Sequence, residues 1–126
     1  MLSEIKTSLF TQLEANTALP IYYDNVDSDV PTSTHLRPFV LPATTDTIGT
    51  NDLGKEQGLL QVNVYTLKGS GQLDGVVIAE AMIAIFPRSL ALTGVRIDEY
   101  GSIGPSLLVD SWQVTPVSFP YYSLID

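Results

Sequence analysis

The segment LLQVNVYTL, residues 59–67, alternates apolar and polar side chains and is the clearest strand signal in the chain. Neighbouring side chains of a β-strand point to opposite faces. One face would carry Leu60, Val62 and Val64, and the other Gln61, Asn63 and Tyr65. Such a strand needs partner strands and a second layer that covers its apolar face. We therefore expect a sheet with helices packed on one side.

Two segments predict the helices of that layer. Residues 1–15 carry an apolar stripe at spacings of three and four, formed by Leu2, Ile5, Leu9 and Leu13. Residues 74–86 are apolar at nearly every position and include several alanines, which favour a helix. Because Pro87 follows, we expect this second helix to end there and to be buried in the core.

A further strand is predicted in HLRPFVLP, residues 35–42. The alternation places Leu36 and Val40 on one face and Phe39 and Leu41 on the other. Because Pro38 removes a ladder donor, this strand should lie at a sheet edge or contain a bulge.

Other strands are expected at residues 21–23, 92–104 and 106–120, the last two joined by a turn at 104–105. Residues 24–34 and 43–58 are rich in polar and turn-forming types and predict loops. The element order predicts a single domain over 1–126 of the α+β class. Its architecture would be a mostly antiparallel β-sheet with two α-helices packed on one face.

The charge balance disfavours specific nucleic-acid binding. The chain has 126 residues and a formal net charge of −8, which repels phosphates. Its basic residues are scattered and form no cluster: Lys6, Arg37, Lys55, Lys68, Arg88 and Arg96. The aromatic side chains of Tyr22, Tyr23, Tyr65 and Trp112 are therefore predicted to be core and interface residues rather than a platform for bases.

The chain contains no cysteine, which excludes disulfides, thiolate zinc sites and a thiol nucleophile. Its N-terminus lacks the basic region of a signal peptide. The longest apolar run, residues 76–86, contains Glu80 and is about half the ~20 residues that a membrane span needs. We expect no contact with a membrane.

Signals for catalysis are incomplete. The acidic run DNVDSD lacks the glycine and the distal glutamate of a calcium loop, and KGSGQLDG lacks the ending of a phosphate-binding loop. His35, the only histidine, is predicted to be an ordinary exposed or edge residue. Asp98 and Glu99 are adjacent and would point to opposite faces of a strand. We expect no enzyme activity and assign no catalytic, metal-binding or cofactor-binding residue.

Several segments, in their order and spacing, resemble the tail terminator proteins of long-tailed bacteriophages. MLSEIKTSLFTQLEA leads into ALPIYYDN, RPFVLPATT precedes a polar loop, and GLLQVNVYTLKGSG comes before AEAMIAIFP. In the closing segment WQVTPVSFPYY, Trp112, Pro116, Val117 and Pro120 occupy the places of the family's W-x-x-x-P-V-x-x-P ending. The resemblance covers nearly the whole chain, and the 43–58 loop and Pro38 depart from it.

The resemblance implies a homohexameric ring without enzyme activity at the head-proximal end of the virion tail, assembled in the host cytoplasm. Such a ring stops polymerisation of the tail tube protein at the correct length and contacts the head-completion or connector proteins. DNA would pass through its lumen without specific binding. The candidate lumen residues are Asp24, Asp27 and Asp29, and the candidate contacts to neighbouring subunits or the tube are Phe39, Leu41, Ile48, Leu53, Phe119, Tyr121 and Tyr122.

The last of these contacts come from the C-terminal segment. Trp112 and Val114 are expected to close the core against the second helix, and the donors missing at Pro116 and Pro120 predict that strand pairing fades beyond Pro116. The aromatic residues beyond it would then lie on an arm that a neighbouring subunit covers. An arm folded back on its own sheet is an equal alternative.

Two other functions remain open from the sequence. One is a different head–tail joining or minor tail protein. The other is a small α+β module outside any virus that binds a small molecule or peptide.

Overall fold

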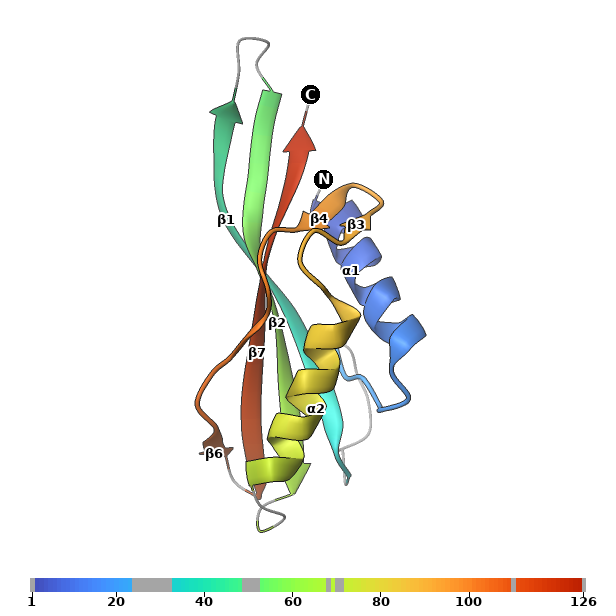
Figure 1. The fold of residues 1–126 in the computed structure, drawn as a ribbon, viewed down its shortest axis with the longest axis vertical. Coiled ribbons are helices and arrows are strands. Elements are labelled where there is room, and N and C mark those ends of the chain that lie inside the picture. Colours follow the sequence, from blue (N-terminus) through green and yellow to red (C-terminus); the bar gives the residue numbers. More distant parts are fainter. Residues whose placement is uncertain are drawn as a thin grey trace.

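The computed structural model describes residues 2–23, 33–48, 53–67, 69, 72–109 and 111–125 (Figure 1). Its helices are α1 (Leu2–Asn16) and α2 (Gln72–Ile85). Its strands are β1 (His35–Ile48), β2 (Leu53–Leu67), β3 (Ala91–Leu92), β4 (Val95–Ile97), β5 (Ser102–Ile103), β6 (Leu107–Val109) and β7 (Trp112–Ile125). Asp24, Asp27 and Asp29 lie outside the described residues.

The strands form one antiparallel sheet in the order β1-β2-β7-β4-β3, with β5 and β6 pairing with β7 below β4. Strand β2 is central and pairs along its whole length with β7, from Gly54 opposite Ile125 to Leu67 opposite Trp112. Both helices lie on the same side of the sheet (Figure 1). The predicted α+β class, with two helices on one face, is confirmed.

Alternation along the long strands selects which side chains meet the helices. The even-numbered residues of β2 from Gly58 to Thr66 and the odd-numbered residues of β7 from Gln113 to Tyr121 are buried. They pack with the buried stripe of α1, and Phe119 lies 5.0 Å from Phe86, measured between ring centroids. Burying each large apolar side chain contributes about 1.5–3 kcal/mol, so this layer holds most of the stability.

One glycine lets α2 approach the sheet closely. A Cβ atom added to Gly75 would lie 2.5 Å from Thr115 Oγ1. Because a real Cβ cannot come that near, only glycine allows α2 to rest on β7 at this position. The predicted helix over residues 74–86 is confirmed and begins two residues earlier.

The predicted loop over residues 43–58 is wrong. Residues 43–48 extend β1 and residues 53–58 begin β2, so a long hairpin takes the place of the loop. The strands pair up to Ile48 opposite Leu53, with a register shift between Pro42 and Thr45. Polar composition indicated a loop, but threonines are frequent in strands and the register continues from the core below. The edge position predicted for the β1 strand is confirmed, and the register runs through Pro38 without a bulge.

The predicted fading of strand pairing beyond Pro116 is also wrong, because β7 pairs with β2 as far as Ile125. The carbonyl groups of Pro116 and Pro120 accept bonds from Gly104 and Asp98, on the side of β7 away from β2. Since backbone groups alternate in direction, the missing proline donors face that same side. The β2–β7 ladder therefore loses no bond, and the segment folds on its own sheet.

Smaller corrections concern the remaining strands. Residues 92–104 and 106–120 are divided among several short strands and β7, and the segment 21–23 makes one bridge, between Ile21 and Leu36. Trp112 and Val114 do not face α2, because their register partners Leu67 and Tyr65 lie on the opposite side of the sheet from the buried positions of β2. No helix in the described part of the chain is long and apolar enough to cross a membrane.

Candidate assembly interface

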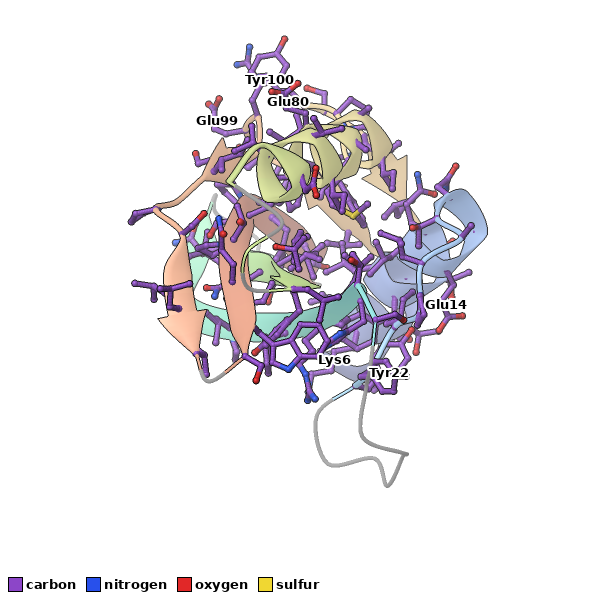
Figure 2. The ribbon with its side chains drawn as sticks, turned by 90° about the horizontal axis from the view of Figure 1, so that it is seen from below. Lys6, Glu14, Tyr22, Glu80, Glu99 and Tyr100 are labelled. Atoms are coloured by element: carbon purple, nitrogen blue, oxygen red, sulfur yellow. The ribbon has the colours of Figure 1, made fainter. Side chains whose placement is uncertain are left out.

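The sheet face turned away from the helices, which we call the open face, carries no carboxylate along residues 37–41, 57–67 and 112–122. Register places these side chains on it: Arg37, Phe39, Leu41, Gln57, Leu59, Gln61, Asn63, Tyr65, Leu67, Trp112, Val114, Pro116, Ser118, Pro120 and Tyr122. Most of the described acidic residues lie elsewhere, on the helices and near β4: Glu4, Glu14, Asp74, Glu80, Asp98 and Glu99, of which Glu80 and Glu99 lie on or beside α2 in Figure 2. In β1, Asp46 is the register partner of Lys55, which continues the odd-numbered row of β2 beyond Gln57. Over the residues named for the open face, a protein with a net charge of −8 therefore presents a surface whose only charged side chain is that of Arg37.

Several apolar side chains on the open face are accessible. Leu41 and Leu59 are directly paired across β1 and β2 and expose 48% and 38% of their surface. Contiguous apolar surface that no helix covers is typical of contact sites between proteins. Both leucines lie next to the register shift that begins at Pro42, and Leu41 lines a pocket together with Lys6 and Phe10 of α1.

An aromatic cluster occupies the lower end of the open face. His35 stacks on Tyr65 at a centroid distance of 4.7 Å and meets Trp112 edge-on at 4.8 Å and Tyr22 at 5.2 Å. The Arg37 guanidinium lies 5.4 Å from the centroid of the Tyr65 ring. The expectation that Tyr22, Tyr65 and Trp112 are core and interface residues agrees with this packing.

His35 is wrongly predicted as an exposed residue. It lies on the edge strand β1, but only 1% of its surface is accessible because Tyr22, Tyr65 and Trp112 enclose it. Its Nδ1–H donates to the Ser33 carbonyl at 2.8 Å, and Nε2 has no partner among the described residues. Burial lowers the pKa of His35, and the Arg37 charge lowers it further, against the Ser33 bond, which raises it.

Tyr23, which the sequence grouped with these aromatic residues, lies apart from them. Its ring contacts Phe10 at a centroid distance of 4.9 Å, and its hydroxyl donates to Glu14. Burial raises the pKa of Tyr23, and the Glu14 carboxylate raises it further. The residue therefore joins α1 to the segment that leads toward β1.

The predicted contact residues fall into three groups. Phe39, Leu41 and Tyr122 lie on the open face, partly or largely accessible. Ile48 and Leu53 are the last register pair before the hairpin turn.

Phe119 and Tyr121 were predicted to be exposed if the C-terminal segment formed an arm. They are instead buried in the protomer core with at most 1% accessible surface. They stabilise the sheet from within and offer no surface to a neighbour in this conformation.

Sequence reasoning missed a second accessible apolar site, strand β6. Leu107, Leu108 and Val109 expose 61%, 65% and 45% of their surface although they are consecutive. The signal was present as the apolar run Leu107–Val109 between Ser106 and Asp110. The strand predicted over residues 106–120 includes this run, so the sequence did not indicate a separate strand at a sheet edge.

The remaining surface offers little for chemistry. An open groove of about 630 Å³ runs along α1 and is lined mainly by hydroxyl and short side chains, among them Ser8 and Thr93. Within the described residues, no three histidine, aspartate or glutamate side chains come together as a metal site would require.

Comparison with known proteins gives the family. No curated protein matches the chain. A solved structure is similar over 98% of this chain and 95% of its own, with 28% sequence identity and a TM-score of 0.77. A family model described as phage tail terminator protein matches residues 4–121, which includes both helices and nearly the whole sheet. The chain therefore belongs to the phage tail terminator family.

Proposed function

We propose that six copies of this protein form a ring at the head-proximal end of the tail tube. There the ring stops polymerisation of the tube protein and contacts the head-completion proteins. Family membership makes the protein a structural component of bacteriophage tail assembly. The observation that carries the finer proposal is the β1–β2 ribbon, which extends beyond the layer of helices (Figure 1).

The ribbon suits a contact with the tube end. Its strands stay paired up to Ile48 and Leu53, so the hairpin end is held at a distance from the core. Leu41 and Leu59 provide accessible apolar surface at the base of the segment that runs to Ile48 and Leu53. A tube subunit that packs on this surface would bury both leucines, as is usual for accessible apolar surface at contacts between proteins.

Deleting the gene tests the role in termination. We expect overlong tubes without heads in negative-stain electron micrographs of the lysate. Normal tails beside unattached heads would instead indicate a joining role. Intact particles would place the function outside the virion and would favour the small-molecule or peptide-binding module.

Complementation of that deletion tests the hairpin. Replacing residues 47–54 by Asn-Gly joins the register partners Asp46 and Lys55 through a two-residue turn. A matched variant replaces only residues 49–52 and keeps the Ile48–Leu53 pair. We expect the first variant to fold but to leave tails overlong. The second variant should fold and should also restore normal tail length. Normal tail lengths from the first variant would reject the hairpin as the capping element.

We further propose that Asp24, Asp27 and Asp29 face the lumen, where carboxylates would let DNA slide past. The observation in support is the open face over residues 37–41, 57–67 and 112–122, which carries no carboxylate and so separates a contact surface from the acidic surface. Replacing all three residues by asparagine should slow DNA ejection while tails keep their length. Unchanged ejection would remove them from the lumen.

A further inference from the structure

We infer that strand β6 is the site at which a neighbouring copy adds a strand, and that the added strand is the neighbour's segment Pro20–Tyr23. This inference rests on the proposed ring and names the contact that closes it. It starts from β6, whose three residues are all apolar and all accessible at a sheet edge. Such an edge is a template for pairing with another chain.

The direction of the β6 backbone follows from β7. The carbonyl groups of Pro116 and Pro120 point away from β2, toward the side where β5 and β6 lie. The register between β2 and β7 has no shift, so the backbone N–H and C=O groups of Val114 and Trp112 point to the same side as those of Pro116. Val114 pairs with Leu107, and Trp112 pairs with Val109, so the backbone groups of Leu107 and Val109 face β7. The N–H and C=O groups of Leu108, between them, therefore face outward.

The opposite edge of the sheet is different. The Leu36 N–H donates to the Pro20 carbonyl at 2.9 Å, and the Tyr22 N–H donates to the Leu36 carbonyl at 2.9 Å, so even-numbered groups of β1 point outward. At Pro38 and Pro42 those outward donors are absent. The edge that can accept a strand is therefore the segment Pro20–Tyr23, which lies beside Leu36 at the outer side of β1. Within this segment, the backbone N–H and C=O groups of Ile21 face away from β1.

Strand direction makes these two edges compatible. Each of the pairs β1–β2, β2–β7 and β7–β6 is antiparallel, so β6 runs opposite to β1. The bridge between Ile21 and Leu36 is parallel, so the segment at Ile21 also runs opposite to β6. Rotation about an axis along the strands keeps these directions. A neighbour brought to β6 in this way forms an antiparallel pair, like every other strand pair in the sheet.

Position and charge agree with the pairing. In Figure 1, β6 lies on one side of the lower sheet, and the segment that follows α1 lies on the other side. Neither PSLLV (105–109) nor ALPIYY (18–23) carries a charge in a protein of net charge −8. The two edges can therefore approach without the repulsion that opposes other contacts between copies. Pairing Leu108 with Ile21 places Val109 opposite Pro20.

Cross-linking tests this register, because the chain has no cysteine of its own. The double variant Pro20→Cys with Val109→Cys is introduced into the deletion phage, and isolated tails are treated with a short bismaleimide. We expect a ladder of cross-linked species up to the hexamer on denaturing gels. The control combines Pro20→Cys with Val77→Cys, a similarly exposed position on α2, and should give no ladder.

A second pair of variants tests the outward donor. Leu108→Pro removes the outward N–H, whereas Leu108→Val keeps it. We expect the proline variant to weaken assembly by about five- to tenfold per interface, as the loss of one net hydrogen bond implies. The valine variant should assemble normally, and thermal unfolding of both protomers should match that of the wild type.

The outcomes separate this inference from the proposed function. Tails of normal length that contain the protein but yield no ladder, together with normal assembly of Leu108→Pro, would overturn the β6 contact and leave the ring intact. Tails of normal length that lack the protein would overturn the proposed function, and the β6 contact with it.

Discussion

His35 shows how one buried side chain can make the protein sensitive to acid. Its stacking on Tyr65 and enclosure by Trp112 favour the neutral ring, and the Arg37 charge disfavours a second cation nearby. A pKa lower in the folded than in the unfolded chain means that the unfolded chain binds the proton more readily. The stabilisation is complete above the ordinary pKa of 6.5 and is lost as pH falls through the folded value.

We therefore predict that the melting temperature of the wild type falls on acidification below about pH 6.5 more steeply than that of His35→Phe. Phenylalanine keeps an aromatic ring in the cluster and has no proton to bind. Circular dichroism melts across this pH range provide the measurement, with Arg37→Gln as a companion that should flatten the slope partially. Parallel pH profiles for wild type and His35→Phe would refute the role of the imidazole.

Gly101 supplies a second prediction for a single residue. A Cβ atom at this position would lie 2.5 Å from Cε1 of the buried Phe119 ring and 3.0 Å from Ile83 Cγ1. Both neighbours are held by the core, so neither can move aside easily. Gly101→Ala should destabilise the protein by about 1–3 kcal/mol in urea unfolding, the usual cost of overpacking. Ser102→Ala, at an exposed neighbour, should change stability by at most about 0.5 kcal/mol.

Among the secondary-structure elements, β7 matters most for stability because it joins β2 to every short strand except β3. Truncation after Pro116 would remove Phe119 and Tyr121 from the core as well as nine of the fourteen register pairs between β2 and β7. We predict that this truncation abolishes cooperative unfolding of the protomer. Truncation after Ser123 keeps Phe119 and Tyr121 and should unfold cooperatively near the wild-type temperature. A cooperatively folded protein after truncation at Pro116 would revive the arm interpretation.

Several elements could be predicted from local pattern alone. These are the apolar stripe of α1, the apolar helix α2 that ends before Pro87, and the alternating strand β2. Each sequence pattern follows from one requirement, namely that the element buries one side against a neighbouring layer. Residues 43–48 and 53–58, in the ribbon beyond the helices, are not required to bury a side against the helix layer. Their sequence is therefore polar, and it indicated a loop. The prolines of β7 failed as signals because the side toward which a missing donor points depends on register, which one strand alone does not reveal.

For the whole molecule, charge and contact surface predict a dependence on salt. Copies of net charge −8 repel one another, while β6 and the open face over residues 37–41, 57–67 and 112–122 carry no carboxylate. Raising the salt concentration from about 20 mM to about 300 mM shortens the screening length severalfold. We predict a larger assembled fraction at high salt, measured by sedimentation velocity. Assembly that weakens with salt would show that opposite charges hold the copies together.

The contact surface was only partly predictable. Phe39, Leu41 and Tyr122 could be assigned from alternation, since each lies opposite a core position of its own strand. The cluster around His35 could not, because it joins β1, β2, β7 and the segment after α1. Residues distant in the chain meet there through register, and no local pattern records that.

The prolines of β1 have a consequence for solubility. An apolar edge with a full row of donors can recruit further chains without limit and grow into fibres. Pro38 and Pro42 interrupt that row at alternate outward positions, leaving Val40 as the outward residue between them. Replacing both by threonine would restore the row, and the protein would then scatter light and bind thioflavin on storage. We therefore expect the rings of Pro38 and Pro42 to limit edge-to-edge aggregation of the protein.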